Sequence, residues 1–195
     1  MQQTHATVGS AQVSWHEATP GMSLDALEAA GVTPRDSVID VGGGASHLVD
    51  ALLARRFEDV TVLDVSEVAL TEARDRLDDP PQASWIRADL LHWQPDRAWS
   101  AWHDRAVFHF LTDPSDRVTY RDLLREAVEP GGAIVVATFD LDGPEWCSGL
   151  AVKRYDAAGL ASELGPDFDL LASGTSRHRT PTGTDQPFVW VALRR

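Results

Sequence analysis

The stretch SVIDVGGGASHLVDALL, residues 37–53, begins with an apolar run, passes an aspartate and breaks into three consecutive glycines. The residues that follow place leucine and valine side chains at the spacing of an amphipathic helix. A strand, a glycine turn and a helix in this order bring backbone amides to the positive end of a helix dipole, where a ligand can bind. The first question is therefore what approaches this turn so closely that Gly42, Gly43 and Gly44 carry no side chains.

Short apolar strands alternate with amphipathic helices along the chain, which is typical of an α/β fold with a parallel sheet covered on both faces. Strands are predicted at 37–41, 59–65, 83–90, 98–104, 133–139, 168–174 and 186–195. Helices are predicted at 46–56, from Ser66 onward, at 116–128 and at 156–164. The polar residues 1–20 predict a helix or flap ahead of the first strand.

Composition narrows the classes of protein. A chain of 195 residues suits a single domain, residues 1–195. The net charge of −13 opposes binding to nucleic acid or to an anionic membrane, and no Lys/Arg cluster offsets it. Cys147 is the one cysteine, so no internal disulfide is possible, and no leader-like start or membrane-length apolar run occurs. We expect a soluble, cytoplasmic protein, a monomer or homodimer.

Three ligand classes use a glycine turn of this kind. A phosphate-binding P-loop needs a lysine after the glycines, and none is present. A dinucleotide site needs a third glycine near the position of His47. The remaining pattern has an acid, Asp40, before the first glycine, and a carboxylate there suits a ligand that carries an ammonium group. The alternative is a turn that needs glycine only for tight packing.

Two further acids follow the next two strands. Asp64 ends the second strand, where a carboxylate in a βαβ unit bridges the two hydroxyls of a ribose. Asp89 closes the third strand, in the sequence ADL, and can accept a hydrogen bond from the amine of adenine. An ammonium partner, a ribose partner and an adenine partner in strand order indicate S-adenosylmethionine.

With these motifs the chain, from about residue 13 to the end, resembles the class I S-adenosylmethionine-dependent methyltransferases. The resemblance is carried by VIDVGGGAS, the acid at Asp64, ADL, EPGG before the fifth strand, and the final pair of strands. It implies a Rossmann-like sheet of seven strands with helices on both faces and the last strand antiparallel. It also implies roles in cofactor binding for Trp15, Asp40, Gly42, Gly43, Gly44, Asp64, Val65, Asp89 and Leu90. Among these, Gly42 and Gly44 would line the methionine and ribose, and Val65 the adenine face.

The segment WHDRAVFHFL supplies candidates for the chemistry. In the fold that the resemblance implies, the fourth strand ends beside the reactive methyl group. His103, Asp104 and His109 are candidate bases, and Arg105 is a candidate for holding an anionic acceptor. The alternatives are a structural ion pair between Asp104 and Arg105, and a packed core histidine at His109.

A narrower resemblance concerns the methyl acceptor. The segments WHDRAVFHFLTDPSDRVTYRDLL and FDLDGPEWCSGLAVKRYDAAGL are similar to parts of thiopurine and related thiol S-methyltransferases, and Trp15 resembles the tryptophan that folds over their cofactor. The chain departs from that pattern by an extra histidine in WHD. Similar patterns also occur in small lysine methyltransferases.

The function predicted from the sequence is methyl transfer to a small-molecule acceptor, a thiol or another soft heteroatom. The alternatives are a protein lysine N-methyltransferase and a non-catalytic protein that binds S-adenosylmethionine. An NAD-dependent oxidoreductase is disfavoured because the third glycine and a Tyr-x-x-x-Lys motif are absent. Cys147 cannot supply several thiolates to a soft ion, and the seven histidines lack paired ligand spacing, so no metal is predicted.

Overall fold

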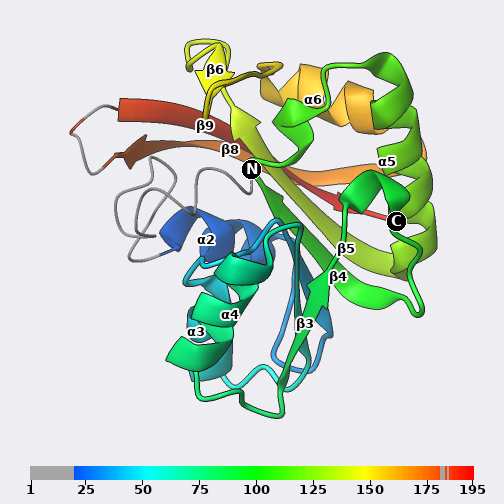
Figure 1. Cartoon of the computed structure of the whole chain (residues 1–195). Coiled ribbons are helices and arrows are strands. Elements are labelled where there is room, and N and C mark those ends of the chain that lie inside the picture. Colours follow the sequence, from blue (N-terminus) through cyan, green and yellow to red (C-terminus); the bar gives the residue numbers. More distant parts are fainter. Residues whose placement is uncertain (1–19, 181–182, 184) are drawn as a thin grey trace.

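A computed structural model describes residues 20–180, 183 and 185–195, and its centre is a seven-stranded sheet in the order β3-β2-β1-β4-β5-β9-β8 (Figure 1). The strands are β1 Val38–Val41, β2 Val60–Asp64, β3 Ala83–Arg87, β4 Trp99–Arg105, β5 Val128–Phe139, β8 Asp169–Arg179 and β9 Asp185–Arg194. β1 to β5 are parallel to one another, whereas β9 is antiparallel to both β5 and β8. The predicted seven-stranded sheet with an antiparallel last strand is therefore confirmed.

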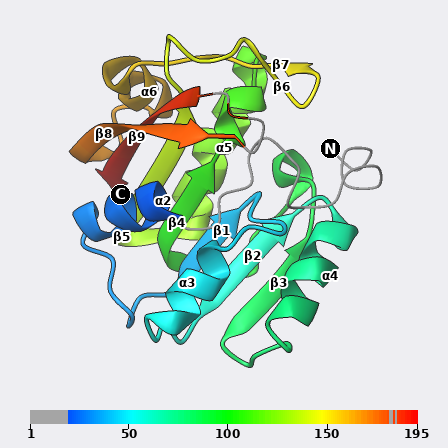
Figure 2. The ribbon, with the colours of Figure 1, turned by 90° about the vertical axis from the view of Figure 1, so that its left-hand side faces the viewer.

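Helices cover both faces of the sheet, as predicted (Figures 1 and 2). The helices are α2 Gly21–Ala29, α3 Leu48–Ala54, α4 Glu67–Arg76, α5 Pro114–Ala127 and α6 Ala157–Leu164. Side chains of α2, α3 and α4 share a buried cluster with Val38 and Val60. Side chains of α5 and α6 share the other large cluster with Ile39 and Leu63. Successive residues of each strand thus supply opposite cores, because side chains alternate along a strand.

Capping side chains set the helix starts. Ser66 caps α4, and its hydroxyl accepts a hydrogen bond from the Ala69 amide at 3.3 Å, as the sequence predicted. Asp113 caps α5 with proline in the first turn, so α5 begins two residues before the predicted 116. Asp156 caps α6 through the Gly159 amide at 2.6 Å.

Three local features differ from the sequence-based prediction. β3 ends at Arg87 rather than at residue 90, because Asp89 caps a short 3-10 helix, η2 Leu90–His92. β5 begins at Val128 and runs through EPGG, and its register with β4 shifts between Trp99 and Ala101. A small hairpin, β6 Trp146–Cys147 and β7 Leu150–Ala151, follows β5 and was not predicted.

The carboxyl ends of β1 and β4 lie side by side where the strand order reverses, since β2 and β3 extend from β1 in one direction and β5 from β4 in the other. Ligands of open α/β sheets bind at this point. The predicted flap at residues 1–20, with Trp15, lies outside the described residues apart from residue 20. In the described part of the chain, no helix has the length and apolar character needed to cross a membrane.

Candidate functional site

The glycine turn is closed by the protein's own side chains. A Cβ added to Gly42, whose φ is +67°, would lie 2.1 Å from Val107 Cγ2. A Cβ on Gly43 would lie 2.5 Å from Asp40 Oδ2, and one on Gly44, whose φ is +44°, would lie 2.8 Å from Asp64 Oδ2. Tight packing therefore accounts for the absence of side chains at these three positions. The same packing places Asp40, Asp64 and the turn after β4 against the glycine loop.

Arg76, at the end of α4, fixes the outer side of this turn. Its guanidinium donates to the carbonyl oxygens of Ala45 (3.3 Å) and Ser46 (2.8 Å), and binds both oxygens of Asp50 at 2.9 and 2.7 Å. A planar guanidinium with several donors holds backbone and carboxylate together. No sequence signal had singled out Arg76, because its partners lie about 30 positions away.

Asp40 does not stand alone beneath the turn. Its Oδ1 lies 2.7 Å from Nδ1 of His103, and its Oδ2 is 3.4 Å from the Ser46 hydroxyl. Asp40 and His103 are in register on β1 and β4 and are 3% and 2% exposed. Two residues that the sequence assigned to different tasks are therefore one buried pair.

The other predicted cofactor residues lie at the ends of the next two strands. Asp64 ends β2, is buried, and its Oδ1 accepts a hydrogen bond from the Ser66 amide at 2.8 Å. The Ala88 amide donates to the Asp64 carbonyl at 3.1 Å, which joins the two strand ends. Asp89 precedes Leu90, and Val65 is partly exposed beside them. The structure thus brings Val65, Asp89 and Leu90 to one edge with Asp64.

Asp104 is an anchor of the turn that follows β4. Its fully buried carboxylate accepts hydrogen bonds from the Val107 amide (2.9 Å), the Phe108 amide (3.1 Å) and the Tyr120 hydroxyl (2.7 Å). Burial raises the pKa of the Asp104 carboxyl to about 6, against the opposing effect of these hydrogen bonds. An ion pair with Arg105, the alternative interpretation of this residue from the sequence, is not among these contacts. Tyr120 stood in the segment that carries the thiol-methyltransferase resemblance but was not predicted as a site residue.

The turn anchored by Asp104 presents Arg105 and His109. Ala106, between them, has a φ of +67°, a strained value for a residue with a side chain. The Arg105 guanidinium lies 4.9 Å from the centre of the Phe188 ring, and the His109 ring packs against Phe139 at 4.7 Å. Burial, assisted by the charge of Arg105, lowers the pKa of His109 to about 3. Both ring nitrogens of His109 are buried, and neither has a hydrogen-bond partner among the described residues.

This burial predicts an acid-dependent loss of stability that His109→Phe should remove. The His109 imidazole stays neutral in the folded protein, whereas in the unfolded chain its pKa is 6.5. Below pH 6.5 the unfolded chain therefore gains a proton that the folded protein does not, and acidification favours unfolding. By pH 5 the loss from this residue should be about 2 kcal/mol, from 1.36 kcal/mol per pH unit. We expect denaturant titrations to show His109→Phe gaining this amount relative to wild type between pH 7.5 and pH 5.

The effect of His109 must be taken from the difference in unfolding free energy between wild type and His109→Phe. The reason is that the titration of Asp104 changes the stability in the opposite direction. Its raised pKa means that the fold binds a proton more tightly than the unfolded chain, so its contribution grows as the pH falls through 6. That contribution is common to wild type and His109→Phe and cancels in the difference. A stability difference that stays constant from pH 7.5 to pH 5 would contradict a neutral, buried His109.

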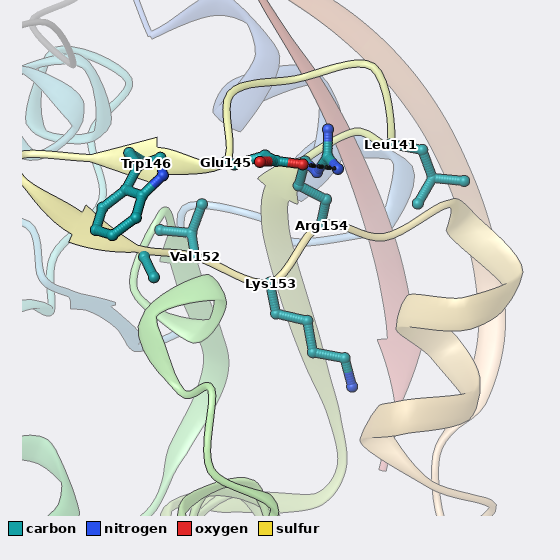
Figure 3. A pocket seen from close by; sticks show the side chains of 7 residues that line it. Leu141, Glu145, Trp146, Val152, Lys153 and Arg154 are labelled. Atoms are coloured by element: carbon teal, nitrogen blue, oxygen red, sulfur yellow. Dashed lines mark hydrogen bonds and ion pairs between the residues drawn. The ribbon is translucent and has the colours of Figure 1, made fainter.

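Beyond β5, the hairpin β6–β7 contributes residues both to a buried cluster and to an open pocket. Cys147 points into a buried cluster with Phe139 and Phe188, and burial raises the pKa of its thiol. On the other side is an open pocket of about 440 Å³, lined by Leu141, Glu145, Trp146, Ala151, Val152, Lys153 and Arg154. Figure 3 shows the ion pair of Glu145 with Arg154, at 2.8 Å, between Trp146 and Leu141. Lys153 is engaged by Glu163 at 2.6 Å, so both cations of the pocket have internal partners.

Comparisons with known proteins decide the family. Residues 38–132 match the family model described as "Methyltransferase domain". An uncharacterized methyltransferase of Mycobacterium tuberculosis is 33% identical over 143 residues, which cover 72% of this chain and 68% of the relative. The chain belongs to the S-adenosylmethionine-dependent methyltransferases. The sequence-based prediction of this enzyme class is confirmed, whereas the comparisons show no particular likeness to thiopurine or thiol S-methyltransferases.

Two further proteins that are similar to this methyltransferase have a methyl acceptor in their names, and the two acceptors differ. The 23S rRNA (guanine(748)-N(1))-methyltransferase of Streptomyces fradiae is 31% identical, and the match covers 86% of this chain and 57% of the relative. The 1,6-didemethyltoxoflavin-N1-methyltransferase of Burkholderia thailandensis, solved with S-adenosylhomocysteine, shares the fold with a TM-score of 0.73 at 16% identity. That alignment covers 100% of this chain and 83% of the other. The cofactor of the methyltransferase is S-adenosylmethionine.

The residues present fit this cofactor. The glycine turn follows β1 directly, Asp64 lies at the end of β2, and Asp89 lies just after β3. Nε2 of His103, next to the turn, is buried and has no hydrogen-bond partner among the residues that the structure describes. A buried polar atom without a partner in a native fold calls for an explanation, and a bound group is one. The candidate site of the methyltransferase therefore lies along the carboxyl ends of β1 to β5.

Proposed function

We propose that this methyltransferase transfers the methyl group of S-adenosylmethionine to a small-molecule thiol. The observation that carries the proposal is the contact between two turns. Gly42, in the turn after β1, packs directly on Val107, in the turn that presents Arg105 and His109. A cofactor held by the first turn would have its reactive end beside the second, where an acceptor would bind.

For the cofactor, we assign the glycine turn Gly42–Gly44 to the methionine and ribose. Asp64 would accept hydrogen bonds from the ribose hydroxyls, Asp89 from the adenine amine, and Val65 and Leu90 would line the adenine. Bound S-adenosylmethionine supplies an electrophilic methyl group. The chain's own residues would align the acceptor with it and exclude water.

The properties of the candidate bases favour an acceptor that ionises easily. The carboxylate of Asp104 is occupied by three hydrogen bonds, which suits a positioning role. His109, with a pKa of about 3, is a weak base at neutral pH. A thiol has a pKa of about 8.5 and is already a few per cent ionised, whereas a lysine amine, at about 10.4, needs a stronger base. A thiolate also suits the neighbourhood of the Arg105 charge.

Protein and RNA acceptors fit less well. The formal charge of −13 repels a polyanion such as RNA, although one relative carries an rRNA base in its name. A protein lysine would have to lose its proton in a site where the Asp104 carboxylate is occupied by three hydrogen bonds and where His109 is a weak base. A small thiol avoids both difficulties.

A screen of acceptors tests the proposal. Purified protein with S-adenosylmethionine should release S-adenosylhomocysteine in the presence of small thiols, and much less with phenols, amines, carboxylates or a short RNA. The rate should rise with pH through the acceptor's own pKa, because the thiolate is the nucleophile. Turnover confined to oxygen, nitrogen or RNA acceptors would contradict the thiol proposal while leaving the family assignment intact.

The same assay should include Arg105→Ala. Removing a charge that holds an anionic acceptor should lower kcat/KM at least tenfold. Arg97→Ala is the matched control, because Arg97 pairs with Asp59 at the start of β2, at the opposite edge of the sheet. Equal losses in the two variants would argue against a role for Arg105 in holding the acceptor.

A further inference from the structure

The buried pair of Asp40 and His103 has a geometry that orients the imidazole. Asp40 Oδ1 and His103 Nδ1 are 2.7 Å apart, on two strands that meet where the strand order reverses. With Asp40 ionised, its carboxylate can only accept hydrogen bonds, and Nδ1 is then the donor of this bond. In the neutral ring, Nε2 is then left with a lone pair, ready to accept a hydrogen bond.

Nε2 is also the unsatisfied atom of the pair. It is buried and has no hydrogen-bond partner in the described part of the chain, whereas both oxygens of Asp40 have neighbours. Asp40 Oδ2 lies under Gly43 and beside the Ser46 hydroxyl. A buried acceptor without a donor is unfavourable, so a group that donates a hydrogen bond is the expected partner of Nε2.

Nε2 of His103 lies next to the glycine turn, so the cofactor assigned to that turn is the expected source of the donor. The sequence predicted that Asp40 serves the ammonium group of the cofactor, but His103 occupies one of its oxygens. We propose that the His103 imidazole, oriented by Asp40, accepts a hydrogen bond from the ammonium group of bound S-adenosylmethionine. Asp40 is then a positioning residue, and its negative charge behind the ring favours the cation in front. This inference rests on the cofactor assignment and adds a residue to it.

Two ligands separate this role from a merely structural one. S-adenosylhomocysteine carries the ammonium group, whereas 5′-methylthioadenosine keeps the nucleoside and lacks the amino-acid part. Titration calorimetry of the full chain should give Kd for both. His103→Asn can still donate to Asp40 from the place of Nδ1 but has no atom in the place of Nε2. We expect it to weaken S-adenosylhomocysteine about tenfold and to change 5′-methylthioadenosine less than twofold.

His103→Gln and Arg97→Ala complete the design. A glutamine places a carbonyl oxygen near the position of Nε2 and should recover part of the affinity for S-adenosylhomocysteine. Arg97→Ala, which removes a side chain paired with Asp59 at the other end of β2, should leave both affinities unchanged. Asp40→Asn should selectively weaken S-adenosylhomocysteine, by less than His103→Asn, because the amide oxygen can still accept from Nδ1 but lacks the charge.

Three results would overturn the inference. Equal losses for both ligands in His103→Asn would indicate a structural role. Unchanged affinity with lost turnover would make His103 a base for the acceptor instead. Wild-type protein that binds 5′-methylthioadenosine as tightly as S-adenosylhomocysteine would show that the ammonium group is not recognised. Wild-type protein that binds neither ligand would remove the cofactor assignment itself, which is a separate failure.

Discussion

Asp64→Asn is expected to weaken binding of S-adenosylhomocysteine by about 10- to 100-fold while changing the melting temperature by only a few degrees. The proposed partner of Asp64 is the ribose diol, whose two hydroxyls donate to one carboxylate. Hydrogen bonds to a charged group contribute roughly 1.5–3 kcal/mol each, and an amide NH₂ cannot accept them. The fold should tolerate the change, because the amide oxygen of asparagine can still accept from the Ser66 amide, now at 2.8 Å.

Titration calorimetry measures this effect, with Asp59→Asn as the control. Asp59 immediately precedes β2, at its other end, and pairs with Arg97 through two hydrogen bonds of 2.7 Å. The same chemical change there should leave the affinity unaltered. If Asp64→Asn binds S-adenosylhomocysteine as tightly as wild type, the ribose does not contact Asp64.

The fold could be predicted because its signals are local. β1, β2 and the part of β5 from Ala133 onward are buried along their whole length and mostly apolar, as expected of strands buried on both faces. Ser66 caps α4 through a hydrogen bond that spans three residues. Errors occurred where local signals compete, as at Asp89, which caps η2 and so ends β3 early. The hairpin at Trp146 is two residues per strand, too short for a periodic pattern.

The candidate site could be predicted by residue type but not by partner. Asp40 and His103 are 63 positions apart, and their contact depends on the register of β1 with β4, which no spacing reveals. Arg76 likewise reaches Asp50 across 26 positions, and Tyr120 reaches Asp104 from another element. Each of these residues would be interpreted from the sequence as acting alone, whereas the structure shows it as one member of a hydrogen-bonded pair.

The two turns of the site depend on each other. Gly42 and Ala106 both have positive φ values, and Val107 fills the space that a side chain at Gly42 would need. Glycine adopts a positive φ freely, whereas the positive φ of Ala106 is strained and persists only where surrounding contacts hold it. Asp104 provides these contacts for the second turn, and Arg76 does so for the first. Their loss should therefore affect stability and activity together.

Asp104→Ala is accordingly expected to lower the free energy of unfolding by roughly 3 kcal/mol or more, and turnover with it. The substitution leaves the Tyr120 hydroxyl and the Val107 and Phe108 amides without their acceptor in a buried site, and each unsatisfied group costs about 1–3 kcal/mol. Asp104→Asn keeps one acceptor oxygen and should lose less. Chemical denaturation at pH 7.5 measures both variants.

The control is Asp156→Ala, which removes the cap of α6 at an exposed position and should cost about 1 kcal/mol. If Asp104→Ala lost no more than this control, Asp104 would not anchor the turn. The result also bears on the chemistry. A catalytic base would lose turnover at little cost in stability, whereas an anchor loses both, because Arg105 and His109 are held on the turn that Asp104 closes.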